Sequence, residues 1–371
     1  MIMKKSILSS HYPLNTRTTE INGREVSKYY TNIEDEYYAL RESVGILDCS
    51  SFGVFRIFGD EATDFLNNLV TKDIAYLNVK NISECCFLNE KANVVASAYM
   101  LKTDDDFLVI TPWESAESLH KWLLKNQKGD VEIEDITEKR ALISVEGPSS
   151  LNFLKKFFSH NIESIAPQTF SQDILFEGED ILVARISRTG EYGYMLLINK
   201  SKAENLFNNL LKDGETEYHV KLCGLDAVET CMLEIRQPIF RFEDERIGNL
   251  FELNHQWLVQ FDKDEDYVGK EKLFDFFSEN KRFLTIGFES NVVEEVENGT
   301  NIYLGNQNIG KVLYTRYSYH RKANIGLALV NCDLAASDMT FQVNVGGNPN
   351  EITTISNPYV TLTSWKKMSN S

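Results

Sequence analysis

The chain has 371 residues, which is enough for two or three domains with separate cores. Its formal net charge of −17 argues against nonspecific nucleic-acid or anionic-membrane binding, because both need clustered lysine and arginine. It contains no run of about 18 apolar residues that would form a transmembrane helix, and its N-terminal apolar patch is too short for a signal peptide. We therefore expect a cytoplasmic protein. The six cysteines form no CxxC pair, which favours buried, reduced thiols over a zinc or redox site.

Short strands alternate with amphipathic helices through the first 278 residues. The hydrophobic patterns predict strands at 54–58, 85–88, 94–101, 107–111, 141–146, 174–176, 181–186 and 194–198. They predict helices at 114–124, 150–158 and 203–211, together with one that begins after Asp60 and one that begins after Gly224. This order is typical of two related α/β halves.

Helices largely stop from Arg282 onward. Short strands are predicted there at 283–288, 302–304, 310–314, 323–329 and 341–345, separated by turns. The change predicts a small all-β domain over residues 279–371, following an α/β region over residues 1–278. The boundary between the two is expected near Asn280.

Six segments occur in an order that carries a family resemblance. They are NIEDEYYALRESVGILDCSSFGVFRIFG at 32–59, FLNEKANVV at 87–95, RISRTGEYGY at 185–194, GLDAVETCMLE at 224–234, DYVGKEKL at 266–273 and IGLALV at 325–330. Together they resemble the motifs of the aminomethyltransferases, the T-protein family of the glycine cleavage system. The resemblance implies an α+β fold with two intertwined α/β folate-binding domains and a C-terminal β-barrel around a central channel. It also implies tetrahydrofolate as the cofactor.

Glu191 is the leading candidate for cofactor recognition. A carboxylate fixed by a turn accepts two parallel N–H bonds, and the edge of a reduced pterin presents such a donor pair. The motif around Glu191 therefore implies a pterin-binding role. Trp257 is either a ring that stacks on the cofactor or a core residue, and Tyr192 could line the same cleft.

Several residues depart from the family pattern. The family helix carries two arginines at the positions of Val228 and Met232, so cationic contacts are lost there. Arg188 replaces a family tyrosine, and Arg236 follows four residues after Met232; either could supply a substitute charge to the cofactor. The basic segment 316–322 either lies near the tail of the folate or forms a solvated loop.

The largest departure lies in VVASAYM at 94–100. The family has two consecutive aspartates where this chain has alanine and serine, and the second, catalytic one falls on Ser97. A serine has no accessible charge near neutral pH and cannot assist proton transfer as a carboxylate does. The site is then either inactive or adapted to a different one-carbon step. Tyr99 and His255 are candidates for the acid, and a buried structural role is the alternative for His255.

Three functions are compatible with these residues. The first is a tetrahydrofolate-dependent methyl or methylene transferase, or demethylase, that acts on a small-molecule one-carbon donor. The second is the aminomethyltransferase of the glycine cleavage system, against which Ser97 and the lost arginines weigh. The third is a non-catalytic folate-binding protein of the type that assists iron–sulfur assembly or tRNA modification, although the cysteine signature of those proteins is missing here.

Overall fold

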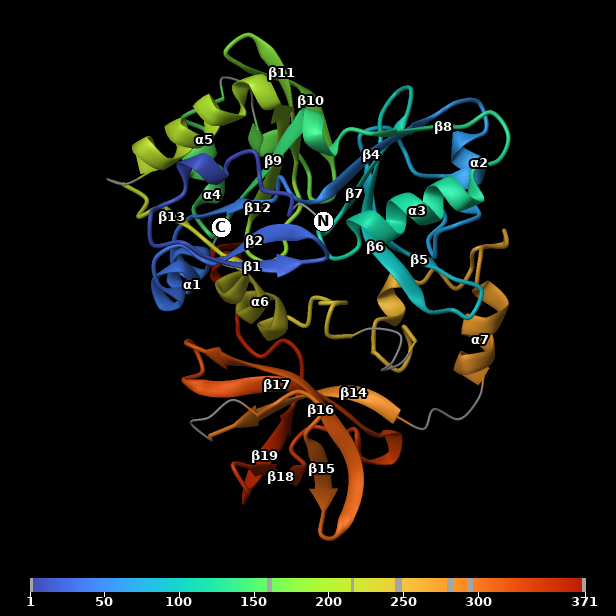
Figure 1. Ribbon diagram of the computed structural model, residues 1–371, viewed down its shortest axis with the longest axis vertical. Coiled ribbons are helices and arrows are strands. Elements are labelled where there is room, and N and C mark those ends of the chain that lie inside the picture. Colours follow the sequence, from blue (N-terminus) through green and yellow to red (C-terminus); the bar gives the residue numbers. More distant parts are fainter. Residues whose placement is uncertain are drawn as a thin grey trace.

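A computed structural model describes residues 3–158, 162–214, 217–243, 249–278, 283–291 and 296–368. Figure 1 shows two α/β lobes side by side, and a third lobe of β-strands beneath them. The N-terminal hairpin and helix α6 lie between the upper lobes and the β-lobe (Figure 1).

The first lobe is a five-stranded sheet in the order β5-β6-β7-β4-β8. Its strands are β4 (Gly53–Phe58), β5 (Ile82–Leu88), β6 (Val94–Lys102), β7 (Phe107–Thr111) and β8 (Glu132–Asp135). Successive side chains in a strand point to opposite faces. One face packs on α2 (Ala62–Asn67) and α3 (Ala116–Asn126). The other face contributes to the core shared with the second lobe.

The second lobe is a six-stranded sheet in the order β10-β11-β12-β9-β3-β13. Its strands are β3 (Gly45–Asp48), β9 (Arg140–Glu146), β10 (Phe170–Phe176), β11 (Glu179–Ala184), β12 (Gly193–Asn199) and β13 (Lys221–Leu222). Helices α4 (Ser150–Leu154) and α5 (Lys200–Gly214) pack on one face of it. Because β3 belongs to this sheet and β4 to the first, the two lobes are intertwined.

Two central helices join the lobes. Helix α1 (Ile33–Glu42) begins at Asn32, whose side chain accepts the N–H of Asp35 at 2.8 Å. Helix α6 (Leu225–Glu234) follows Gly224, where a Cβ would meet the carbonyl oxygen of Lys28 at 2.3 Å. Only glycine fits that position without moving the neighbouring strand. The hairpin β1 (Arg17–Ile21) and β2 (Arg24–Tyr29) lies beside α6.

The third lobe is a closed barrel in the order β14-β17-β16-β15-β18-β19. Its strands are β14 (Phe283–Ser290), β15 (Asn301–Leu304), β16 (Gln307–Ser318), β17 (Ala323–Asn331), β18 (Thr340–Val345) and β19 (Asn348–Ile355). Helix α7 (Lys270–Ser278) precedes the barrel and α8 (Thr363–Met368) follows it. The N–H of Tyr359 donates to the carbonyl of Glu234 at 2.7 Å, which brings the end of the chain back to α6.

Single-turn 3₁₀ segments complete the description. They are η1 (Ser9–His11), η2 (Thr137–Lys139), η3 (Ile162–Ser164), η4 (Gln256–Leu258) and η5 (Cys332–Leu334). Within the described residues, no helix combines the length and the apolar character needed to cross a bilayer. The same residues contain no group of three or more His, Cys, Asp or Glu arranged to hold a metal ion. Five of the six cysteines are buried free thiols, namely Cys49, Cys85, Cys86, Cys223 and Cys231.

The predicted α+β class and the C-terminal barrel are confirmed. The predicted helix after Asp60 is present as α2, whereas the helix expected over 150–158 ends at Leu154. The sequence patterns do not predict the strands β1, β2, β3, β8, β13 and β19, and most of β1 and β19 is too exposed to show an apolar pattern. The predicted boundary near Asn280 lies outside the described residues.

Candidate functional site

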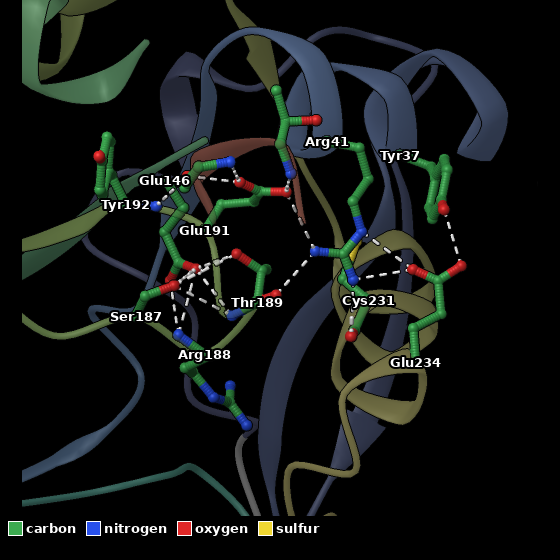
Figure 2. Close-up of polar contacts among 12 residues, drawn as sticks. Tyr37, Arg41, Glu146, Ser187, Arg188, Thr189, Glu191, Tyr192, Cys231 and Glu234 are labelled. Carbon is green, nitrogen blue, oxygen red and sulfur yellow. Dashed lines mark hydrogen bonds and ion pairs between the residues drawn. The ribbon is translucent and has the colours of Figure 1, made fainter. Parts of the chain in front are cut away.

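A buried carboxylate fixes the loop between β11 and β12. Glu146, the last residue of β9, is fully buried and accepts the N–H groups of Arg188 at 3.1 Å and Thr189 at 3.0 Å. It also accepts the hydroxyl groups of Ser187 at 2.7 Å and Thr189 at 2.6 Å. The side chain of Arg188 points away from this network (Figure 2). The loop is therefore held by two backbone N–H groups and two hydroxyl side chains, while the side chain of Arg188 is left to face other groups.

Arg41 connects the same loop to both central helices. From α1, its Nη1 donates to the carbonyl of Thr189 at 2.7 Å, and its Nε and Nη2 donate to Glu234 of α6 at 2.9 and 2.8 Å. Tyr37 donates its hydroxyl to the other oxygen of Glu234 at 2.7 Å. Figure 2 shows this chain of contacts running from α1 and α6 to Glu191. Charge-assisted bonds of this kind set the position of the loop.

Glu191 caps the last helix of the chain. Its buried side chain accepts the N–H of Thr363 at 3.0 Å on Oε1 and the N–H of Ser364 at 2.8 Å on Oε2. A carboxylate at a helix N-terminus satisfies N–H groups that lack partners within the helix. An ionised carboxylate offers about four acceptor positions. Glu191 therefore keeps some capacity for a further donor on Oε1, where Arg41 Nη1 lies at 3.9 Å.

Glu191 also borders a cavity of about 310 Å³ between the two upper lobes. The first lobe contributes Glu84 and Tyr99, and the loop contributes Ser187, Gly190 and Tyr192. The remaining lining residues are Pro167, Gln168, Arg185, Ile186, Gly193, Ser364 and Trp365. Two carboxylates and several aromatic rings thus meet in one concave site, which is the usual character of a ligand pocket.

Ser97, Tyr99 and Glu84 share one face of the first sheet. Glu84 on β5 lies directly opposite Tyr99 on β6, and Ser97 is two residues before Tyr99 on the same strand. Residues at these positions project from the same face. Ser97 is partly buried, and its carbonyl accepts the hydroxyl of Thr111 at 2.7 Å. A carboxylate therefore does occupy the face where the family's catalytic aspartate is expected, but it comes from the neighbouring strand.

The cavity changes the acidity of Glu84 and Tyr99. Burial raises the pKa of Glu84 to about 7, while a hydrogen bond from Gln237 at 2.9 Å and the charge of Arg188 act in the opposite direction. Burial also raises the pKa of Tyr99 well above its ordinary value, with a further contribution from Glu84. Near neutral pH, Glu84 can both give and take a proton, whereas Tyr99 keeps its proton.

Arg236 and His255 belong to a separate, closed cluster. Arg236 makes a two-point contact with Glu243, at 3.1 and 2.8 Å, and donates to the carbonyl of Leu253 at 2.7 Å. His255 is fully buried, and its Nε2 lies 2.8 Å from Glu243. Burial lowers the pKa of His255, so the ring is neutral at neutral pH. The charge that Arg236 was expected to offer the cofactor is used inside the protein.

The remaining predicted residues lie in different settings. Tyr192 borders the Glu191 cavity, and its N–H donates to Ser364 Oγ at 3.1 Å. Trp257 lies in η4, is 45% exposed and does not line that cavity. Arg188 is buried and lies against the rings of Phe52 and Trp113. The structure therefore brings Tyr99, Tyr192 and Glu191 to one cavity, which neither Ser97 nor Trp257 lines.

Comparisons with known proteins bear on this architecture. The family model described as the GCVT N-terminal domain matches residues 8–263, and the model described as the glycine cleavage T-protein C-terminal barrel domain matches residues 281–360. The chain belongs to the glycine cleavage T-protein family. Members of this family use tetrahydrofolate as the one-carbon carrier.

Individual T-protein relatives match nearly the whole chain. The aminomethyltransferase of Thermotoga maritima is 28% identical over 365 residues, which cover 96% of this chain and 98% of that protein. The aminomethyltransferase of Geobacillus sp. is 26% identical over 360 residues, covering 97% and 99%. The crystal structure of glycine cleavage system aminomethyltransferase T from Bartonella henselae has a TM-score of 0.88 at 17% identity, covering 96% and 98%. The last likeness shows that the fold is shared.

This T-protein family member lacks polar groups where the family helix carries arginines. Val228 and Met232 are buried in α6, within the core that α6 shares with α1 and both sheets. Their apolar side chains fit that core, and α6 keeps Glu229 and Glu234 as its buried charges. Glu229 holds Arg241 and Arg316, with Nη2–Oε2 distances of 2.5 and 2.7 Å. The basic segment 316–322 is thus tied to α6 through Arg316.

The cavity fits tetrahydrofolate by the chemistry of its lining. The donor edge of a reduced pterin needs acceptors, which the carboxylate of Glu191 supplies, and its ring needs flat apolar walls, which aromatic side chains supply. The fit at Glu191 requires the pterin to share that carboxylate with the N-terminus of α8.

Glu84 is the site residue that sequence reasoning missed. The predicted strand began at residue 85, so Glu84 was left outside the hairpin that contains Ser97. The observed strand begins at Ile82. Extending the predicted pairing by one residue would have placed Glu84 opposite Tyr99, because pairing in a hairpin continues in register.

Proposed function

We propose that this chain transfers a one-carbon unit to tetrahydrofolate in the Glu191 cavity, with Glu84 handling the proton. The observation that carries the proposal is the position of Glu84, which lies opposite Tyr99 and lines the same cavity as Glu191. Family membership supports the coarser statement that the reaction is tetrahydrofolate-dependent one-carbon transfer. Glu84 supplies the carboxylate that Ser97 does not.

The chemistry requires a proton at the leaving group. Transfer of an aminomethyl carbon to tetrahydrofolate would form bonds from that carbon to two nitrogens of the acceptor and would break its bonds to sulfur and to the amino group. The two protons lost by the acceptor nitrogens would end on the departing thiol and on ammonia. A group whose pKa lies near the working pH is best suited to this transfer, and the pKa of Glu84 is about 7. Tyr99 can orient the donor by hydrogen bonding while keeping its own proton.

The pterin is proposed to lie toward Glu191. Glu191, Tyr192 and Trp365 border that part of the cavity, and Gly190 leaves room beside them. The same contacts would exclude water from the reacting atoms, which strengthens electrostatic interactions in the site. The backbone network through Glu146 and Arg41 holds Glu191 in place before any ligand enters.

The named relatives favour an aminomethyl donor, as in the glycine cleavage system, over the demethylation that the sequence suggested. The relatives described above are named aminomethyltransferases, and they match along nearly their whole length. One observation favours a small-molecule donor as a second candidate: Arg188, which replaces a family tyrosine, is a buried cation close to Glu84. The non-catalytic folate-binding function gains no observation of its own.

Two measurements test the proposal. Tetrahydrofolate at about 100 times its dissociation constant should add roughly 2.7 kcal/mol of stability, visible as a thermal shift. An aminomethyl-loaded lipoyl carrier protein should then yield methylenetetrahydrofolate and ammonia with the wild-type chain. Absence of the thermal shift at saturating tetrahydrofolate would contradict the proposed function. Binding of tetrahydrofolate without turnover of the carrier protein would favour the second candidate, a small-molecule donor.

A further inference from the structure

The carboxylate proposed to bind the pterin is closed off by the C-terminal helix. Glu191 borders the cavity, but its side chain is 0% exposed. Thr363 donates its N–H to Oε1 at 3.0 Å, and Ser364 donates both its N–H, at 2.8 Å, and its hydroxyl to Oε2. A ligand in the cavity therefore cannot contact this carboxylate while the covering groups of α8 stay in place.

The acceptor positions of Glu191 identify the contact that must change. An ionised carboxylate offers about four such positions, which is about two on each oxygen. The donors of α8 take one position on Oε1 and two on Oε2. The edge of a pterin donates two parallel N–H bonds, one to each oxygen. Thr363 can therefore keep its contact with Glu191, whereas Ser364 must give up at least one bond.

The segment before α8 is anchored independently of Glu191. The N–H of Tyr359 donates to the carbonyl of Glu234 at 2.7 Å. Leu362 is buried beside Gly190, where an added Cβ would lie 2.9 Å from Leu362 Cδ1. Within α8, by contrast, Trp365 is 46% exposed and borders the same cavity. This division allows α8 to pivot after Leu362 while the chain before it stays in place.

We propose that α8 is a displaceable cover of the pterin site and that Ser364 releases Glu191 when tetrahydrofolate binds. A donor that Ser364 withdraws from Oε2 is replaced by an N–H of the ligand, so the buried carboxylate keeps its hydrogen bonds in both states. A ligand without such a donor pair gains nothing from the exchange, so the cover favours pterins over other rings of similar size. This inference rests on the proposed binding of tetrahydrofolate at Glu191 and adds a conformational step to it.

Amide hydrogen exchange of the full chain, with and without saturating tetrahydrofolate, tests the movement. Exchange in peptides that span residues 362–368 should become faster on binding, because the N–H of Ser364 loses its acceptor. A ligand that only packs against α8 would slow this exchange instead. Exchange of the N–H of Tyr359, which is held by Glu234, should stay unchanged. Slower or unchanged exchange at 362–368 while tetrahydrofolate binds overturns the proposal.

Ser364→Ala separates a cover from a structural support. The variant lacks the hydroxyl bond to Oε2, so its dissociation constant for tetrahydrofolate, measured by calorimetry, should be about two- to tenfold lower than that of the wild type, the equivalent of one hydrogen bond. Its melting temperature should fall slightly, because the N–H of Tyr192 also loses its acceptor. The control Ser278→Ala, which removes an exposed hydroxyl bond at the end of α7, should keep wild-type affinity. Equal or weaker binding by Ser364→Ala overturns the proposal.

The two measurements distinguish failure of the cover from failure of the proposed function. If tetrahydrofolate binds the wild type with neither faster exchange in α8 nor tighter binding by Ser364→Ala, the proposed function stands and the cover is overturned. If tetrahydrofolate binds neither the wild type nor Ser364→Ala, the proposed function fails, and the cover fails with it because no ligand displaces α8.

Discussion

Two of the buried charge clusters in this molecule combine glutamate with arginine and behave in opposite ways. In the first, Glu243 lies within hydrogen-bonding distance of Arg236 and of His255, and these two residues lower its pKa to about 2 against the effect of burial. In the second, Glu84 lies near Arg188 without an ion pair, and burial raises its pKa to about 7. Pairing distance decides whether a buried charge stabilises the fold or stays available for chemistry.

The largest effect is expected for Glu84→Gln. The amide keeps the shape and the contact with Gln237 but cannot carry a proton to the leaving group. Turnover of the aminomethyl carrier should fall by about 10²–10⁴-fold, the usual contribution of a general acid. Glu134→Gln on β8, which removes a carboxylate paired with Lys139 at the surface, should retain wild-type turnover. A fall of less than tenfold in Glu84→Gln would assign the proton transfer to another group.

The next largest effect is expected for Glu243→Gln. The amide leaves Arg236 buried without its counter-charge, and breaking a buried pair in this way costs about 3–5 kcal/mol. Chemical denaturation at neutral pH measures the change, with surface variant Glu117→Gln as the control. In the wild type, the contribution of the ionised Glu243 carboxylate to stability should be complete above pH 4.5, the ordinary pKa of a glutamate. It should disappear as the pH falls toward 2. Unchanged stability would show that the cluster is not a structural pair.

A smaller effect is expected for Glu191→Gln, because the donors to this carboxylate are the neutral N–H groups of Thr363 and Ser364 and the hydroxyl of Ser364, while Arg41 Nη1 lies 3.9 Å away. The variant should lose about 1–3 kcal/mol through the weakened cap of α8. It should also bind tetrahydrofolate more weakly than Glu191→Asp does, since an amide presents a donor to the donor edge of the pterin. Denaturation and calorimetry on the same samples separate the two losses. Equal folate affinity in Glu191→Gln and wild type would place the pterin elsewhere.

The pH dependence of stability should reveal the raised pKa of Glu84 without any substrate. Because its pKa is about 7 in the folded chain and its ordinary value is 4.5, the folded state holds a proton between these values that the unfolded state has released. The stability of the wild type should therefore fall as the pH rises through this window. The free energy of unfolding of Glu84→Gln, relative to wild type, should rise from pH 4.5 to pH 7 and then level off. A difference that does not change with pH contradicts the raised pKa.

The smallest effect is expected at Ser97. It lies on the same face as Glu84 but on the diagonal, about 7–8 Å away in a typical antiparallel pair. Ser97→Asp should raise the pKa of Glu84 further, because a second carboxylate disfavours its ionised form. Ser97→Ala should leave the pH profile of turnover unchanged. If both variants behave like the wild type, residue 97 does not face the site.

Sequence reasoning predicted the fold class and the Glu191 turn because both depend on local patterns and on the order of motifs. It did not reveal that the turn carboxylate caps α8, since that contact joins residues 191 and 363, which no local pattern connects. It assigned the charge of Arg236 to the cofactor because sequence spacing does not show that Glu243 and Leu253 take it up. Glu84 was missed for a simpler reason, a strand boundary misplaced by a few residues.

The most direct measurement is the titration of the Glu84 carboxyl group by NMR, using protein labelled with ¹³C at the glutamate carboxyl carbons. Comparison with Glu84→Gln assigns its resonance. This resonance should titrate near pH 7, above the ordinary glutamate value of 4.5, because the cavity keeps Glu84 protonated where Ser97 offers no charge. A Glu84 resonance that titrates near its ordinary value of 4.5 would contradict the account, because the chain would then lack the proton donor on which the proposed reaction depends.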